Sequence, residues 1–164
     1  MRVYFSARPL PDDQGRFVSH TGFLELDPAD LTRIVRIGDR PIMDLGGLGM
    51  FDEFGIYPAS VIADGDRLLA YYAGWTRCVS VPFNTAIGVA ESRDGGEQFT
   101  RLGTGPVLSY SADEPFVVSW PKIRRCGDRW VLWASPVRAC RKDLAPCRAC
   151  HPQPPLTHIS GCAE

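Results

Sequence analysis

The sequence predicts an all-β fold in which a unit of four antiparallel strands is repeated. One observation is that two pairs of matching residues share one spacing: Arg2 and Arg67, and Pro41 and Pro106, each lie 65 residues apart. Another is that short apolar and β-branched segments follow one another between glycine-containing turns, with no helical period. Repeats of this length made of short strands are typical of β-propeller blades, whereas β-helix repeats are much shorter. A β-sandwich with one duplicated hairpin is the alternative fold.

A complete copy of the unit spans residues 51–108. Gly65 and the segment Asp94-Gly95-Gly96 provide turns between its predicted strands, because glycine adopts positive φ without steric cost. The segments between these turns are rich in β-branched, aromatic and apolar residues, which favour strands. The four strands are predicted at 59–63, 67–74, 85–92 and 98–102.

Partial copies flank the complete one. The segment 2–43 begins at the second strand of the unit, and the segment 113–134 ends after the second strand. We therefore expect about two to three blades, fewer than the roughly four to eight that close a ring, and interpret the chain as a fragment of a longer protein. Because an open stack leaves strand edges unpaired, self-association through these edges is expected.

The turn "SRDGGEQF" carries a second, smaller pattern. Its Ser92, Asp94, Gly96 and Phe99 resemble the Asp-box of sialidase-type propellers, in which the aspartate ties the turn between strands three and four by hydrogen bonds. The resemblance implies a structural role for Asp94 rather than a catalytic one.

The composition narrows the classes of partner. Lys and Arg number 18 against 19 Asp and Glu, and the formal net charge is −1, which gives no electrostatic reason to bind nucleic acid or an anionic membrane. No apolar run approaches the ~20 residues of a membrane span, and the N-terminal segment lacks the pattern of a signal peptide. We expect a cytoplasmic protein without nucleic-acid or membrane partners.

The segment 135–164 differs in composition from the rest of the chain. It lacks aromatic residues, is rich in Arg, Cys and Pro, and has no period, so we interpret it as an irregular tail, either read from a shifted frame or disordered. "CRACH" at 147–151 matches the c-type haem pattern, but no export signal accompanies it. Four residues of this segment also have the side-chain types of zinc ligands, but the last two lack the spacing that is usual for a ligand pair. We therefore expect no cofactor and no metal. The zinc-ligand types are Cys147, Cys150, His158 and Cys162.

Acidic pairs stand before the first strand of two successive units, at Asp52-Glu53 and Asp113-Glu114. The first strand of each propeller blade lines the central channel, so acids at the start of these strands should converge although they lie far apart in sequence. Two facing carboxylates are what glycoside hydrolysis requires, one to protonate the leaving oxygen and one to attack or to activate water. A capping or turn role is the alternative for each acid. The candidate catalytic residues are Asp52, Asp113 and Glu114, and the candidate sugar-stacking residues are Tyr57, Trp75 and Trp120.

Several stretches, among them "FDEFGIYPASVI" and "DEPFVVSWPKIR", resemble the five-bladed β-propeller glycoside hydrolases, the superfamily of arabinanases, invertases and levansucrases. The likeness covers residues 2–134 and is strongest to an uncharacterised bacterial branch described as glycosyl-hydrolase-like. It implies a partial five-bladed β-propeller and a funnel with three carboxylates, of which Asp52 is one and Asp113 or Glu114 another. It implies that the intact protein acts on glycosidic bonds of a carbohydrate. A carbohydrate-binding propeller without catalysis, or an inactive truncated product, is the alternative.

Overall fold

The computed structural model describes residues 1–112, 114, 117–127 and 129–137. These residues form nine strands in three antiparallel sheets and contain no helix, which confirms the predicted all-β class. No helix long and apolar enough to cross a membrane occurs in this part of the chain. The haem and zinc patterns considered between Cys147 and Cys162 lie outside the described residues, and so does Asp113.

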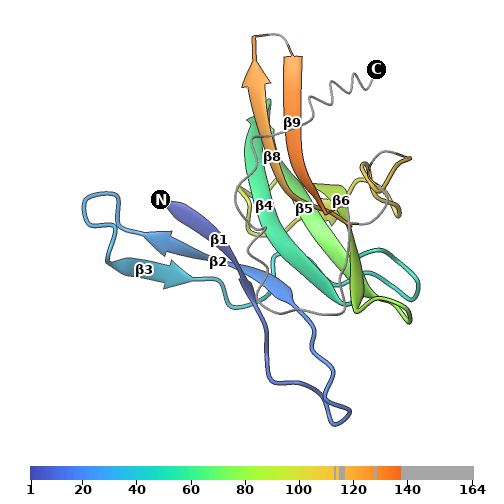
Figure 1. Cartoon of the computed structure of the whole chain (residues 1–164). Helices are drawn as coiled ribbons and strands as arrows, with labels where there is room; N and C mark the ends of the chain where they lie inside the picture. Colours follow the sequence, from blue (N-terminus) through green and yellow to red (C-terminus); the bar gives the residue numbers. More distant parts are fainter. Residues whose placement is uncertain (113, 115–116, 128, 138–164) are drawn as a thin grey trace, which may run out of the picture.

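The second sheet is the complete unit, and its strands follow one another in the order β4-β5-β6-β7. Figure 1 labels the first three of them. All four predicted strands are present. The first begins earlier than predicted, because Gly55 already pairs with Trp75, and the last is short. The strands are β4 (Gly55–Asp64), β5 (Arg67–Arg77), β6 (Phe83–Ser92) and β7 (Thr100–Arg101).

The flanking sheets are incomplete copies of this unit, as the sequence repeat predicts. The first sheet corresponds to strands two to four, and the third sheet to strands one and two. The last strand runs three residues past the predicted limit at Ala134, into the segment predicted to be irregular. The strands are β1 (Arg2–Ala7), β2 (His20–Leu26) and β3 (Ile34–Ile37) in the first sheet, and β8 (Val117–Cys126) and β9 (Arg129–Val137) in the third.

The repeat extends to local irregularities. Both first strands of a unit, β4 and β8, shift register against their partners, between Tyr57 and Ser60 and between Ser119 and Lys122. Each shift inserts one extra residue and contains a proline of the sequence repeat, and proline is tolerated at a bulge because it has no N–H to donate. The hairpin glycine that follows has positive φ in both units, 61° and 69°. The same sequence signals therefore build the same hairpin twice.

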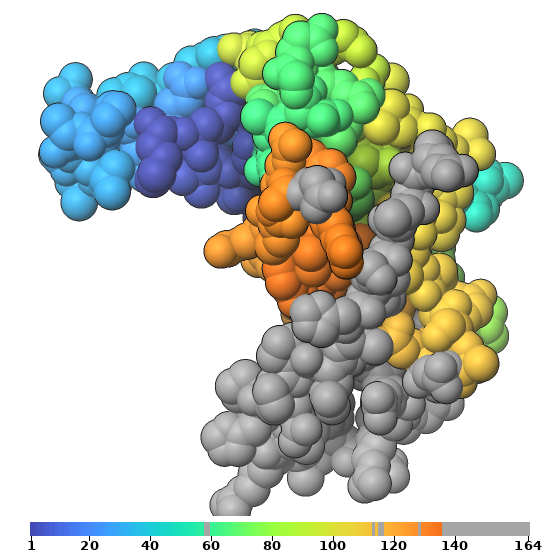
Figure 2. Space-filling model, turned by 90° about the horizontal axis from the view of Figure 1, so that it is seen from above, coloured from blue at the N-terminus to red at the C-terminus, as the bar shows by residue number. Residues whose placement is uncertain are grey.

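The sheets pack face to face through two apolar clusters. Between the first two sheets lie Phe23, Ile56, Tyr72 and Phe99, and Ala73, Ile87 and Val118 join the second sheet to the third. β8 contacts β4, β5 and β6. Figure 2 shows the first sheet as an arm beside the second, with the third sheet packed on the second. Stacked antiparallel sheets of this kind are the blades of a β-propeller.

Candidate functional site

Asp52 is fully buried, at 0% exposure, in the loop between β3 and β4. Its Oδ2 accepts hydrogen bonds from the Tyr72 hydroxyl at 3.0 Å and from Arg101 Nε at 2.8 Å, and it forms an ion pair with Arg101. Its Oδ1 has no hydrogen-bond partner among the described residues and faces Gly46, where an added Cβ would lie 2.1 Å away. One carboxylate oxygen is thus engaged and the other enclosed.

Glycines make room for this loop on the face of the second sheet. A Cβ added at Gly74 of β5 would lie 2.4 Å from Asp52 Cβ, and one added at Gly88 of β6 would lie 2.6 Å from the Phe51 ring. Arg101 also donates to the Asp44 carbonyl at 2.6 Å. The Asp52–Arg101 pair therefore fastens the loop that leads into β4, and with it the start of the inner strand.

The environment of Asp52 keeps Tyr72 protonated. Burial raises the pKa of the Tyr72 phenol, and the negative charge of Asp52 raises it further, because both disfavour the phenolate. Tyr72 therefore acts as a hydrogen-bond donor at ordinary pH. In this arrangement Asp52 contacts no solvent, and a substrate would reach it only if the ion pair with Arg101 opened.

Glu114 occupies a position comparable to that of Asp52. Each acid lies three residues before the first residue of an inner strand, β4 or β8, and Glu114 is 9% exposed. The Glu114 backbone closes a turn with Ser111, whose Oγ accepts the Glu114 N–H at 3.2 Å. The carboxylate of Glu53 accepts the Gly49 N–H at 2.9 Å, which is a local loop contact.

The predicted sugar-stacking residues separate into two groups. Tyr57 and Trp75 lie diagonally across adjacent strands, because Gly55 pairs with Trp75 and Tyr57 with Ala73. Trp75 is only 8% exposed, whereas Trp120, on β8, is 69% exposed and has a φ of 50°. Trp120 offers an open ring, and Trp75 offers at most an edge.

Two arginines that sequence reasoning missed lie beside Tyr57 and Trp75. Arg8 donates to the Tyr57 hydroxyl at 3.2 Å, and its guanidinium lies 6.0 Å from the centre of the Trp75 ring. The Arg77 guanidinium lies 4.0 Å from the centre of the Phe54 ring, and Arg77 donates to the Phe17 carbonyl. We call this set the arginine–aromatic cluster. It consists of Arg8, Phe17, Phe54, Tyr57, Trp75 and Arg77.

Unpartnered polar atoms surround the start of β4. Ser19 forms a bridge to Gly55 from the first sheet, and Trp75 pairs with Gly55 from the other side. Ser19 Oγ, His20 Nδ1 and Trp75 Nε1 are buried and have no hydrogen-bond partner among the described residues. Buried polar groups are normally paired, so this end of β4 is unusual in its chemistry.

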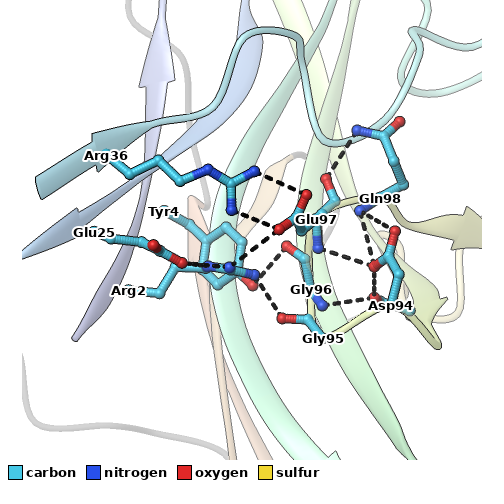
Figure 3. Close-up of polar contacts among 10 residues, drawn as sticks. Arg2, Tyr4, Glu25, Arg36, Asp94, Gly95, Gly96, Glu97 and Gln98 are labelled. Atoms are coloured by element: carbon cyan, nitrogen blue, oxygen red, sulfur yellow. Dashed lines mark hydrogen bonds and ion pairs between the residues drawn. The ribbon is translucent and has the colours of Figure 1, made fainter.

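The opposite end of the second sheet is held by the Asp94 turn (Figure 3). Asp94 Oδ1 accepts from the Ser92 hydroxyl at 2.7 Å and from the Glu97 and Gln98 amides at 2.9 and 3.1 Å. Burial raises the pKa of Asp94, but these hydrogen bonds outweigh it and leave the pKa below its usual value. All of these groups act within the turn, in keeping with the structural role expected of Asp94.

The same turn joins the first sheet to the second. Arg2 donates to the Gly95 carbonyl at 2.5 Å, Tyr4 to the Gly96 carbonyl at 3.0 Å, and Arg36 binds Glu97 through two hydrogen bonds of 2.6 and 3.0 Å. Figure 3 shows these side chains converging on the turn from one side. The network makes the turn an element of blade-to-blade packing.

An open groove of about 500 Å³ lies on the side of the second sheet that carries the loop before β4. Among the residues that the structure describes, no group of three or more His, Cys, Asp or Glu side chains is placed to hold a metal ion. The groove is lined by residues of β6, of the loop before β4 and of the loop after β7. Among them are Met50, Phe51, Asn84, Thr85 and Tyr110.

Comparisons with known proteins find relatives of the chain in sequence and in structure. No protein-family model matches the chain. It is 38% identical over 132 residues to two Mycobacterium tuberculosis proteins, uncharacterized protein Rv1502 of strain H37Rv and uncharacterized protein MT1551 of strain CDC 1551. The match covers 80% of this chain and 42% of each relative, so the chain spans less than half the length of the curated relatives it matches.

Two solved structures share the fold. A glycoside hydrolase superposes with a TM-score of 0.57 at 16% identity, over 81% of this chain and 41% of its own. The GH32 β-fructofuranosidase BmSUC1 of Bombyx mori superposes with a TM-score of 0.52 at 22% identity, over 81% of this chain and 26% of its own. At these identities the likeness speaks to fold alone, and it confirms the prediction of a partial β-propeller.

Proposed function

We propose that the chain is part of a carbohydrate-active β-propeller and that the intact propeller acts on glycosidic bonds. The observation that carries the proposal is the diagonal placement of Tyr57 and Trp75 on adjacent strands at the start of β4, the strand into which the Asp52 loop leads. Aromatic rings bind the apolar faces of sugars, and carboxylates at the same end of the inner strands supply acid–base chemistry. The glycoside hydrolase fold supports this reading.

The candidate carboxylates remain Asp52, Asp113 and Glu114. In an intact funnel, two of them would stand on either side of the scissile bond, one as the acid and the other as the nucleophile or base. Asp52 would have to exchange its ion pair with Arg101 for contact with the substrate. Until it does so, its Oδ2 is engaged and its Oδ1 has no room for a water molecule or a sugar.

Binding without cleavage is the second candidate function, and the burial of Asp52 favours it. A carboxylate with 0% exposure that accepts hydrogen bonds from an arginine and a tyrosine stabilises its loop and is not available to a ligand in this arrangement. In this alternative, the arginine–aromatic cluster and the exposed ring of Trp120 form a glycan-binding face. The two candidates therefore differ in what Asp52 does.

The experiment compares the intact propeller that contains this chain with its Asp52→Asn and Glu53→Gln variants. Hydrolysis of a panel of aryl glycosides and binding to a glycan array are measured for each, together with the free energy of unfolding. Loss of hydrolysis in Asp52→Asn, under conditions in which the unfolding data show that the variant is folded, supports catalysis. Glycan binding without hydrolysis in the unsubstituted propeller supports the binding function, and failure to bind or cleave any glycan refutes both. Glu53→Gln is the matched control, because Glu53 adjoins Asp52 and its carboxylate accepts a hydrogen bond within its own loop, from the Gly49 N–H.

A further inference from the structure

Among the described residues, no acidic side chain forms an ion pair with Arg8 or Arg77. Within the part of the chain that the structure describes, neither guanidinium has a carboxylate oxygen within 4.0 Å. Each donates one hydrogen bond to an uncharged oxygen, Arg8 to Tyr57 and Arg77 to the Phe17 carbonyl. Because a guanidinium has five N–H donors, each arginine retains four. Other arginines of the first two sheets are paired: Arg2 with Glu25, Arg36 with Glu97, Arg67 with Glu91 and Arg101 with Asp52.

Aromatic rings position these guanidinium groups without removing their charge. Arg77 lies 4.0 Å from the centre of the Phe54 ring and 5.9 Å from that of Trp75. Arg8 lies 5.7 Å from the Phe17 ring centre and 6.0 Å from Trp75. Cation–π contacts of this kind orient a guanidinium over a ring face. Arg8 follows β1 of the first sheet and Arg77 ends β5 of the second, yet both lie around the indole of Trp75.

Polar atoms near the start of β4 are also without a hydrogen-bond partner among the described residues. The indole N–H of Trp75 can only donate, and it is buried without a partner. The Ser19 hydroxyl, across Gly55 from Trp75, is also unpartnered. Because these atoms are buried, the donors available at this surface are the two guanidinium groups without a carboxylate partner, and they complement a group that offers several acceptor oxygens and a negative charge.

We propose that the arginine–aromatic cluster binds the carboxylate or phosphate of an acidic sugar. This inference rests on the proposed carbohydrate function and adds that the glycan is anionic, either a uronic acid or a phosphorylated sugar. Arg77 and Arg8 bind the anionic oxygens, for which the planar guanidinium fork is suited. Tyr57 and the edge of Trp75 contact the sugar ring, so the charged group and the ring are recognised by adjacent parts of one surface.

The test is a titration of the isotopically labelled chain, followed by NMR at the indole N–H of Trp75. The probes are glucuronate, glucose 6-phosphate, glucose and inorganic phosphate. We expect the two acidic sugars to shift the Trp75 signal and to bind at least tenfold more tightly than glucose. Arg77→Gln and Arg8→Gln should each weaken the binding of acidic sugars by at least tenfold and leave the binding of glucose unchanged. The preferred acidic sugar identifies the anion as a carboxylate or a phosphate.

Arg93→Gln is the matched control, because it removes one positive charge from an exposed pair with Asp66 in the second sheet. Equal effects of Arg93→Gln and Arg77→Gln would overturn the inference, as would equal affinities for glucuronate and glucose. If neutral glycans bind as well as acidic ones, the anion site is refuted and the carbohydrate function stands. If inorganic phosphate binds through Arg77 as tightly as the acidic sugars, the anion site stands and the carbohydrate function is refuted. Unfolding midpoints of each variant establish that the fold is retained.

Discussion

Replacement of Arg101 by methionine tests whether Asp52 is held as a buried ion pair. The substitution keeps most of the aliphatic volume of the side chain and removes both nitrogens that lie 2.8 Å from Asp52 Oδ2. Asp52 would then keep a single described hydrogen bond, from Tyr72. Its side chain is 0% exposed. A charge that loses its partner in a buried setting has no water to replace it.

The expected loss of stability differs between the two substitutions, because Asp52 is buried and Arg101 is partly exposed. Loss of one partner of a buried ion pair costs about 3–5 kcal/mol, and we expect Arg101→Met to lie in this range because Asp52 is left uncompensated. Asp52→Asn leaves Arg101, which is 19% exposed and can still reach water, so a smaller loss of about 1–3 kcal/mol is expected. The double variant should lose about 1–3 kcal/mol less than the sum of the two single variants.

Urea unfolding followed by tryptophan fluorescence measures these free energies, and the slope of the transition reports whether the unfolding reaction is unchanged. Arg93→Met is the control. Its ion pair with Asp66 joins side chains that are 59% and 83% exposed, and its second contact, with Glu91, is longer at 3.6 Å, so Arg93→Met should change stability by less than about 0.5 kcal/mol. If Arg101→Met is no more destabilising than Arg93→Met, or if the double variant is additive, the reasoning on Asp52 is wrong.

Three further outcomes are expected. Because burial raises the pKa of Tyr72 above its unfolded value, the folded state keeps a proton that the unfolded state loses above about pH 10. The free energy of unfolding should fall there by about 1.4 kcal/mol per pH unit from this group, and pH-dependent urea melts of Tyr72→Phe should show a shallower fall. Gly96→Ala should cost at least about 1–2 kcal/mol more than Gly95→Ala, since both glycines have positive φ but only a Cβ at Gly96 would meet the Tyr4 hydroxyl, at 2.1 Å; equal losses would contradict this reading of the turn. Finally, β9 pairs only with β8 among the described residues, so sedimentation velocity should show mass increasing with concentration, whereas a monomer throughout would exclude association through blade edges.

The strands were predictable because their signals are local and repeated. The hairpin glycine, the proline in the inner strand and the apolar runs recur with one spacing, and the structure places them at equivalent points of successive sheets. The extension of β4 to Gly55 was not predicted, because glycine is a poor strand former and its place depends on pairing with Trp75.

The contacts of the candidate site were less accessible to sequence reasoning. Asp52 meets Arg101, 49 positions away, only because the loop crosses the second sheet over Gly74 and Gly88. The acidic residues could be predicted as site residues from their chemical type, whereas nothing in the sequence distinguishes Arg8 and Arg77 from the other arginines. What sets them apart is that they lie together around the indole of Trp75 without a carboxylate partner in the described structure, and that property depends on the fold.

The most direct test of the carbohydrate proposal is to map a bound glycan on the chain. Amide signals of the labelled protein are followed as the tightest ligand from the glycan array is added. Binding at the start of β4 would shift Gly55 and Trp75 and leave Gly65 and Gly96, at the other end of the second sheet, unchanged. Shifts centred on Gly65 and Gly96, or no shift with any glycan, would contradict the proposal.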